Sequence, residues 1–158
     1  MPIQNAYNLY TANAFRGQKA YGPEHSVQGS TALESPEANF GVALKVGTTP
    51  TQSLIGSLDG NVKAISMREV NHEAKFRPST GETYYKVIET VSAFKEGTIY
   101  LEVTARAAVA NTLANVVEAT GEFTGGAAGG GESQCVNVTW LEDGIVGDIV
   151  LARIDIVA

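Results

Sequence analysis

The chain has 158 residues, enough for one domain with a substantial core, and 44% of them are hydrophobic. Only 18% are charged, against roughly 25% in an average soluble domain, so we expect a neutral surface or one covered by a partner. The net charge of −6 and eleven scattered Lys and Arg residues argue against direct nucleic-acid binding. No apolar run is long enough for a membrane span, and the first residues lack the pattern of a secretory signal. The single cysteine, Cys135, excludes an internal disulfide and fits a reducing compartment.

The first 38 residues differ in composition from the rest of the chain. They are polar, are interrupted by glycine and proline, and show no lasting strand-like or helix-like apolar period. They nevertheless contain four aromatic residues, Tyr7, Tyr10, Phe15 and Tyr21. We therefore interpret residues 1–38 as an extended N-terminal arm that places these aromatic side chains on a neighbouring protein. A frayed terminus is the alternative.

Residues 39–158 are expected to form one β domain, because short apolar runs alternate there with turn residues. In its first half, strands are predicted over residues 40–46, 61–70 and 83–94. Turns are predicted at residues 59–60, 80–81 and 95–97. Asp59-Gly60 indicates a type I′ hairpin, since both central residues of that turn have positive φ.

The second half contains the clearest strand, over residues 98–106. Ile99, Leu101, Val103 and Ala105 alternate there with polar residues, which predicts one buried face. Residues 107–117 leave helix and strand open. Further strands are predicted over residues 116–124, 134–141 and 148–157, with a Gly-rich loop at 124–131. Their inward residues are expected to be Val136, Val138, Trp140, Val150, Ala152, Ile154 and Ile156. The pattern predicts an all-β fold, a jelly-roll-like sandwich or barrel of seven to eight short strands.

No catalytic, cofactor-binding or metal-ligating residue is predicted. His25 and His72 lie far apart, and Cys135 has no Cys-x-x-Cys partner, so metal-ligand spacing is absent. Ser92 to Lys95 matches Ser-x-x-Lys, but this pattern needs a helix and here ends a β-rich run. Asn137 to Thr139 is a glycosylation sequon inside a predicted strand, and we interpret it as accidental.

Several features occur in an order that resembles a known family. Residues 96–103 read EGTIYLEV, a Gly/Ala loop precedes residues 136–140, and residues 147–154 read GDIVLARI. Together with the long polar arm, they resemble the structural cement, or head decoration, proteins of tailed bacteriophages. The resemblance extends over residues 41–156 as a pattern of strands and turns.

The resemblance implies a non-enzymatic virion protein, made in the bacterial cytoplasm and located on the outer capsid surface. It would bind the major capsid protein and link neighbouring subunits, with no cofactor, nucleic acid or membrane involved. Such proteins self-associate, and we favour a homotrimer over a homodimer. The arm aromatics would then be interface residues.

Two other functions remain open at this point. One is a carbohydrate- or receptor-binding β module of a phage tail or fibre, with Trp140 or tyrosines stacking on sugar rings. The alternation of Trp140 with Val138 predicts a core position for this side chain instead. The other is a sandwich hydrolase, which would need a concave acidic cleft with shifted pKa values.

Overall fold

The computed structural model describes residues 14–20, 25–35, 37–68 and 84–156. These residues form no helix, and the all-β prediction is confirmed. They form eleven strands rather than seven or eight, because several ladders are only two to four residues long. The strands are β1 (Val27–Leu33), β2 (Glu37–Asn39), β3 (Ala43–Val46), β4 (Gln52–Ile55), β5 (Ala64–Ser66), β6 (Tyr84–Lys86), β7 (Thr90–Thr104), β8 (Leu113–Val117), β9 (Phe123–Thr124), β10 (Glu132–Trp140) and β11 (Ile149–Ile154).

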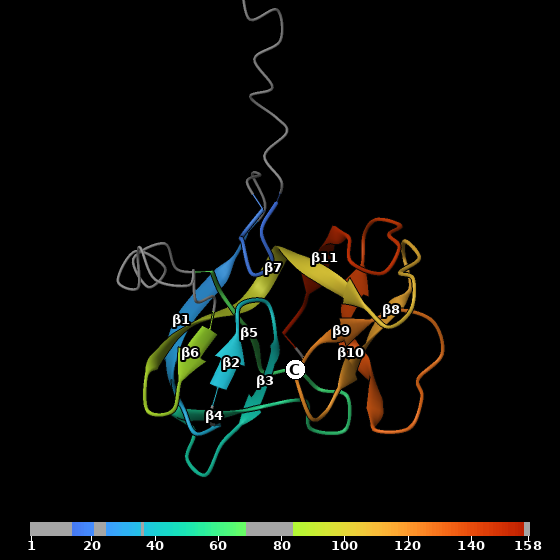
Figure 1. Cartoon of the computed structure of the whole chain (residues 1–158). Helices are drawn as coiled ribbons and strands as arrows, with labels where there is room; N and C mark the ends of the chain where they lie inside the picture. The colour runs from blue at the N-terminus through green and yellow to red at the C-terminus, as the bar shows by residue number, and fades with distance from the viewer. Residues whose placement is uncertain (1–13, 21–24, 36, 69–83, 157–158) are drawn as a thin grey trace, which may run out of the picture.

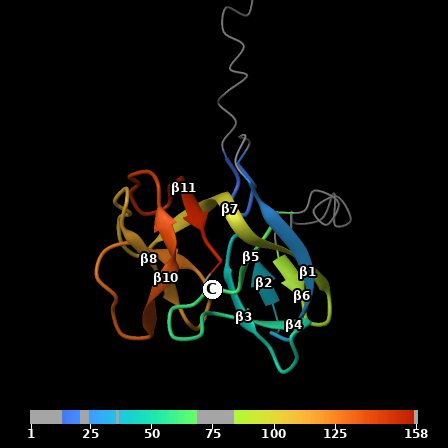
Figure 2. The same cartoon turned by 180° about the vertical axis from the view of Figure 1, so that it is seen from behind.

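Two closed barrels share one long strand. Nine strands pair in the order β1-β4-β3-β5-β7-β11-β10-β8-β9, and β7 pairs additionally with β1 and β9. The first barrel therefore consists of β1, β4, β3, β5 and the start of β7, and the second of the end of β7, β11, β10, β8 and β9. A short parallel pairing closes each ring, β1 with β4 and β7 with β9. Figures 1 and 2 show the barrels side by side, with β7 running through both.

The shared strand β7 corrects one prediction. A turn is expected at residues 95–97, but β7 is continuous over 15 residues. Residues 90–96 pair with β1, and residues 97–102 pair with β11. Gly97 has a φ of 119°, and a Cβ there would lie 2.9 Å from the Phe94 ring. Glycine here marks the place where one strand passes between two barrels, and not a chain reversal.

Two apolar clusters fill the molecule. The smaller one lies in the first barrel and under the β2–β6 pair, and comprises Leu33, Ala38, Phe40, Val42, Leu44, Tyr85 and Val91. The larger one fills the second barrel around Trp140, Phe123 and the inward residues of β7. It also includes Ala43, Ile65 and Phe94 from strands of the first barrel. The barrels thus share an apolar interface, which favours a rigid body.

A hairpin of the first barrel packs on the second. Asp59 and Gly60 have φ values of 52° and 80°, and Leu58 and Asn61 exchange two backbone hydrogen bonds, so the predicted type I′ geometry is confirmed. The Val136 N–H donates to the Gly60 carbonyl at 3.0 Å. A Cβ on Gly60 would lie 2.1 Å from the Gln134 carbonyl oxygen. The hairpin tip therefore touches the backbone of β10 directly.

Two polar side chains add further links between the barrels. Asn137 is 5% exposed; its Oδ1 accepts from the Val62 N–H, and its Nδ2 donates to the Val62 and Asp155 carbonyls. This burial agrees with the interpretation of the sequon as accidental. The Glu118 carboxylate accepts from the Ser57 N–H and hydroxyl across the same junction.

Three side chains predicted to point inward are exposed instead. Val136 is 57% exposed, while Cys135 and Val138 are buried, because the β10–β8 pairing shifts register between Gln134 and Thr139. Ala105 has a φ of 54° and lies beyond the end of β7, and Ile156 lies beyond the end of β11. The open segment 107–117 is a loop followed by strand β8, with no helix.

The predicted arm boundary at residue 38 is also corrected. Strands β1 and β2 both lie within residues 1–38, and β1 supplies one wall of the first barrel. Most of β1 has a polar composition because residues 28–30 are exposed. Among the described residues of this segment, 14–20 and 25–26 precede β1 and belong to no strand of either barrel.

Candidate functional site

The predicted arm residues have different outcomes. Tyr7, Tyr10 and Tyr21 lie outside the described residues, whereas Phe15 is described and is 49% exposed. The Arg68 guanidinium carbon lies 3.9 Å from the centroid of the Phe15 ring. One face of this ring is therefore occupied by a cation of its own chain, and the rest is open to a partner.

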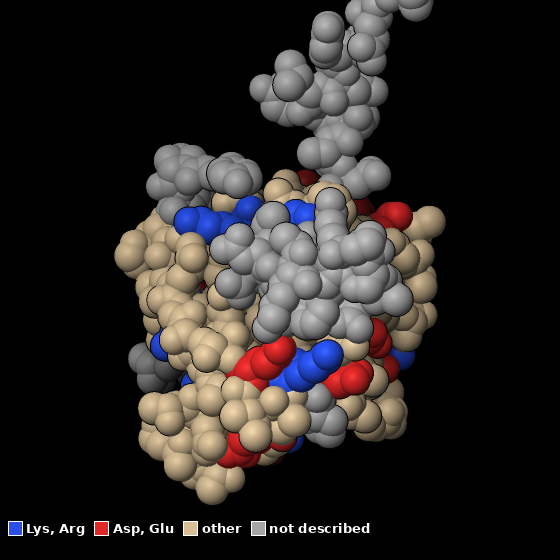
Figure 3. Space-filling model, turned by 60° about the vertical axis from the view of Figure 1, so that its left-hand side comes forward, with Lys and Arg blue, Asp and Glu red and all other residues tan. Residues whose placement is uncertain are grey.

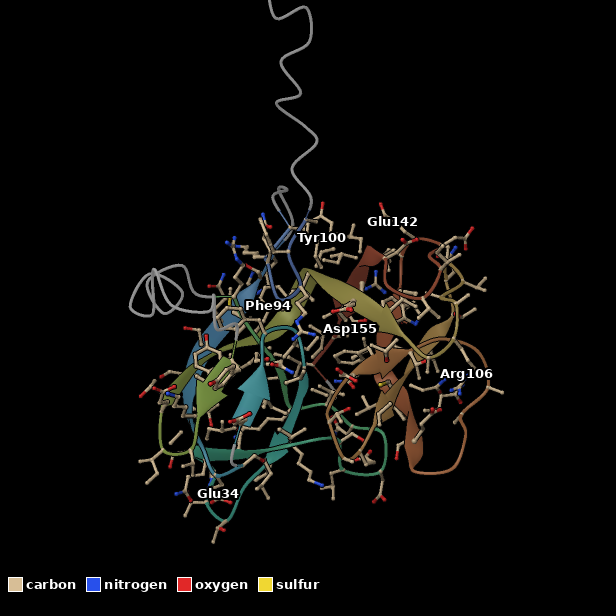
Figure 4. All side chains as sticks on the ribbon, in the orientation of Figure 1. Glu34, Phe94, Tyr100, Arg106, Glu142 and Asp155 are labelled. Carbon is tan, nitrogen blue, oxygen red and sulfur yellow. The ribbon has the colours of Figure 1, made fainter. Side chains whose placement is uncertain are left out.

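Residues 14–20 are docked on β7. The Gly17 N–H donates to the Tyr100 carbonyl at 2.8 Å, and the Tyr100 N–H donates to the Gln18 carbonyl at 2.9 Å. Gly17 has a φ of 76° and lies very close to Gly41. A Cβ on Gly17 would be 2.7 Å from the Gly41 nitrogen. Arg16 also pairs with Glu102 at 3.0 Å. This segment is thus fixed at the upper end of the molecule, near the Tyr100 label in Figure 4.

Few features of the described residues support a catalytic role. No three His, Cys, Asp or Glu side chains gather there in a way that could hold a metal ion. Burial raises the pKa of the Cys135 thiol to about 12, so this thiol is not a nucleophile. Ser92 and Lys95 lie three residues apart on strand β7, and not on the helix that the Ser-x-x-Lys pattern needs. No described helix could cross a membrane.

The loop surface, which we define as Val109, Ile145 and Val146, is one candidate contact. Each of these side chains is more than half exposed. They come from the loops after β7 and β10, which Ala108 and Gly144 join by two backbone hydrogen bonds. Exposed apolar side chains on loops that are tied together favour a protein interface over a flexible loop tip.

Carboxylates hold these loops in shape. Asp143 Oδ1 accepts from the Ala110 N–H at 2.8 Å, and Asp148 Oδ2 accepts from the Ile145 N–H at 3.0 Å. The loops lie at the upper end of the second barrel, beside the Glu142 label in Figure 4. Sequence reasoning missed this surface, although the apolar pair Ile145-Val146 between turn residues was a usable signal.

The β6–β7 turn, with Val87 and Ile88 at its tip, is a second candidate contact. Ile88 is 82% exposed and has a φ of 69°, a conformation that β-branched residues rarely adopt. The turn is pinned to β1, since the Ile88 N–H donates to the Leu33 carbonyl at 2.8 Å. It lies at the opposite corner of the molecule from the loop surface (Figures 1 and 2). A strained, exposed apolar side chain is more readily explained by binding than by folding.

A groove of about 240 Å³ lies where the barrels meet. Its wall combines exposed apolar side chains with two ammonium groups and one carboxylate, namely Val46, Leu58, Ile156, Lys63, Lys95 and Asp155. Figure 4 shows Asp155 between the two barrels. With two lysines and one carboxylate in its lining, this groove is not the acidic cleft that a hydrolase would need.

One face of the described surface carries few charges, in line with the low content of charged residues in the sequence. Figure 3 shows one face on which uncharged atoms cover most of the described surface, with acidic and basic groups interspersed. Trp140 is fully buried, so it cannot stack on a sugar. This removes one basis for the carbohydrate-binding alternative.

Comparisons with known proteins agree with this architecture. Residues 3–156 match the model of a family described as "Structural cement protein (E217 gp24/Pam3 gp6)". A chain in the solved structure "The capsid of Myoviridae Phage XM1" has a TM-score of 0.68, with 97% of both chains covered. Its sequence is 12% identical, so this likeness shows the fold alone. No curated protein sequence matches. The family match over nearly the whole chain makes this protein a member of the phage structural cement proteins, with a structural role in the capsid.

Proposed function

We propose that this protein binds the major capsid protein on the outer surface of the shell and links neighbouring subunits. One observation carries the proposal: the two barrels form one body, and exposed apolar side chains lie at opposite corners of it. A protein that links two subunits needs two separate contact surfaces and a rigid connection between them. The loop surface and the β6–β7 turn supply the contacts.

The connection between these contacts is stiff for physical reasons. Strand β7 crosses both barrels without a break, and the Asp59-Gly60 hairpin and Asn137 add links beside it. Many copies on one shell act together, so a modest affinity at each contact is sufficient. No chemical step is needed, and the role is not enzymatic.

The arm and self-association belong to the same proposal. Tyr7, Tyr10, Phe15 and Tyr21 would add contact area on a neighbouring subunit, starting from the docked residues 14–20. Around a local symmetry axis of the shell, a homotrimer is favoured over a homodimer. The docked segment supports the arm role because it fixes the point from which the arm starts.

The test uses purified shells that lack the cement protein. Variants Ile145→Asp and Ile88→Asp each place a charge at one contact, on exposed side chains that do not support the core. The wild-type chain should bind and raise the unfolding temperature of the shell. Each variant should bind more weakly and lose most of that shell stabilisation, because a single contact cannot link two subunits. If both variants stabilise shells as well as wild type does, the two-contact proposal is wrong.

A further inference from the structure

The groove between the barrels has the composition of a peptide-binding site. Exposed Val46, Leu58 and Ile156 form an apolar rim that comes from β3, the Asp59-Gly60 hairpin and the end of β11. At about 240 Å³ the groove is smaller than the roughly 300–1,000 Å³ of typical drug-sized ligand sites. It therefore suits one or two side chains of a protein segment.

Two lysines give this groove a charge opposite to that of the whole protein. Lys63 Nζ donates to the carbonyls of Pro50 and Gln52, each at 3.0 Å, and to Ser53 Oγ at 3.3 Å. All three acceptors are neutral, so these bonds fix the ammonium without neutralising it.

Lys95 adds a second positive charge nearby. Its side chain folds across Gly29, with Nζ 3.1 Å from where a Cβ of Gly29 would be. Both lysines line the groove, and burial and then repulsion by the Lys95 ammonium lower the pKa of Lys63. Within the described part of the chain, neither lysine pairs with a carboxylate, and Asp155 pairs with Arg153 at 3.3 Å.

The occupant that fits this arrangement carries both an apolar side chain and a carboxylate. A carboxylate beside Lys63 and Lys95 would relieve their mutual repulsion, and an apolar side chain would cover the rim. Because the whole chain carries a net charge of −6, the two lysines are what would attract an acidic segment to this groove.

We propose that the groove binds an acidic, apolar segment of the capsid-shell protein, with its carboxylate facing Lys63 and Lys95. This inference rests on the proposed function and names the partner chemistry at a third surface. The groove lies between the two barrels, so an occupant would contact both at once.

The test measures binding of the purified chain to shells that lack the cement protein. Lys95→Gln should weaken binding about fivefold and Lys95→Glu about twentyfold or more, since the second variant repels the carboxylate. Ile156→Glu should also weaken binding, because it places a charge on the apolar rim. Lys45→Gln is the matched control: it removes one positive charge from the same barrel outside the groove, and should change binding less than about twofold.

Salt dependence provides a second readout. Wild-type binding should weaken as ionic strength rises from about 0.05 to 0.3 M, and Lys95→Gln should show a shallower dependence. If Lys95→Glu and Ile156→Glu bind like wild type while Ile145→Asp does not, the groove inference is wrong and the proposed function stands. If the wild-type chain does not bind shells, both are wrong.

Discussion

Asn137 provides the sharpest test of how the two barrels are held together. Its amide makes three hydrogen bonds, two with the backbone of Val62 and one with the carbonyl of Asp155. Asn137→Ala removes all three. Val62 is 2% exposed, so water cannot easily replace its two lost partners, whereas Asp155 is half exposed and can be solvated.

The expected cost follows from those partners. Each buried backbone group left without a partner costs about 1–3 kcal/mol, so two of them predict a loss of about 2–6 kcal/mol in the free energy of unfolding. Urea unfolding followed by fluorescence measures it, because Trp140 is the only tryptophan and is fully buried in the second barrel. Asn61→Ala, on the exposed side of the same hairpin, is the control and should stay within about 0.5 kcal/mol of wild type. An Asn137→Ala loss as small as that of the control would refute the bridging role of this amide.

Three other outcomes are expected. Ile88→Asn should raise the free energy of unfolding of the isolated protein by about 0.5–1 kcal/mol, since asparagine tolerates the positive φ of 69°. The same variant should weaken shell binding. A lower free energy of unfolding in urea would contradict the inference that Ile88 is strained. Gly60→Ala should destabilise the fold by about 2 kcal/mol or more in thermal unfolding, because the new Cβ would lie 2.1 Å from the Gln134 carbonyl oxygen. Gly130→Ala is the control: Gly130 has open space around it, so this variant should cost less than about 1 kcal/mol. Burial alone raises the pKa of Glu118, but hydrogen bonds from Ser57 and Ser133 and the Lys45 ammonium outweigh it and lower that pKa below 4.5. The resulting stabilisation is present above about pH 4.5 and is lost as pH falls through the lowered pKa, so Glu118→Gln should flatten the loss of stability on acidification, and an unchanged pH profile would count against the role of this carboxylate.

Local patterns in the sequence predict the parts of this fold that depend on neighbours along the chain. The alternation of Ile99, Leu101 and Val103 with polar residues predicts the buried face of β7 correctly. The Asp59-Gly60 pair predicts the type I′ turn of the hairpin between β4 and β5. The same reasoning fails at Gly97, where a glycine that usually indicates a turn lies inside a strand shared by two barrels. Val136 fails because a register shift in β10 depends on its pairing with β8, which no local pattern contains.

The candidate contacts are harder to predict from the sequence, because they combine distant segments. The loop surface depends on the pairing of Ala108 with Gly144, and the groove brings Lys63 and Lys95 beside Ile156. Strand β1 falls within the predicted arm because its exposed residues 28–30 are polar or glycine, so the sequence shows no alternation of apolar residues there. The absence of known catalytic motifs and the cement-protein resemblance, by contrast, could be read directly from the sequence.

The most direct test of the central claim is a cryo-electron microscopy map of shells decorated with the purified chain. We expect each copy to lie on the outer surface, across a boundary between two capsid subunits. The loop surface should then contact one subunit and the β6–β7 turn another. A copy that touches a single subunit, or lies on the inner surface, would contradict the claim that this two-barrel body cements the shell.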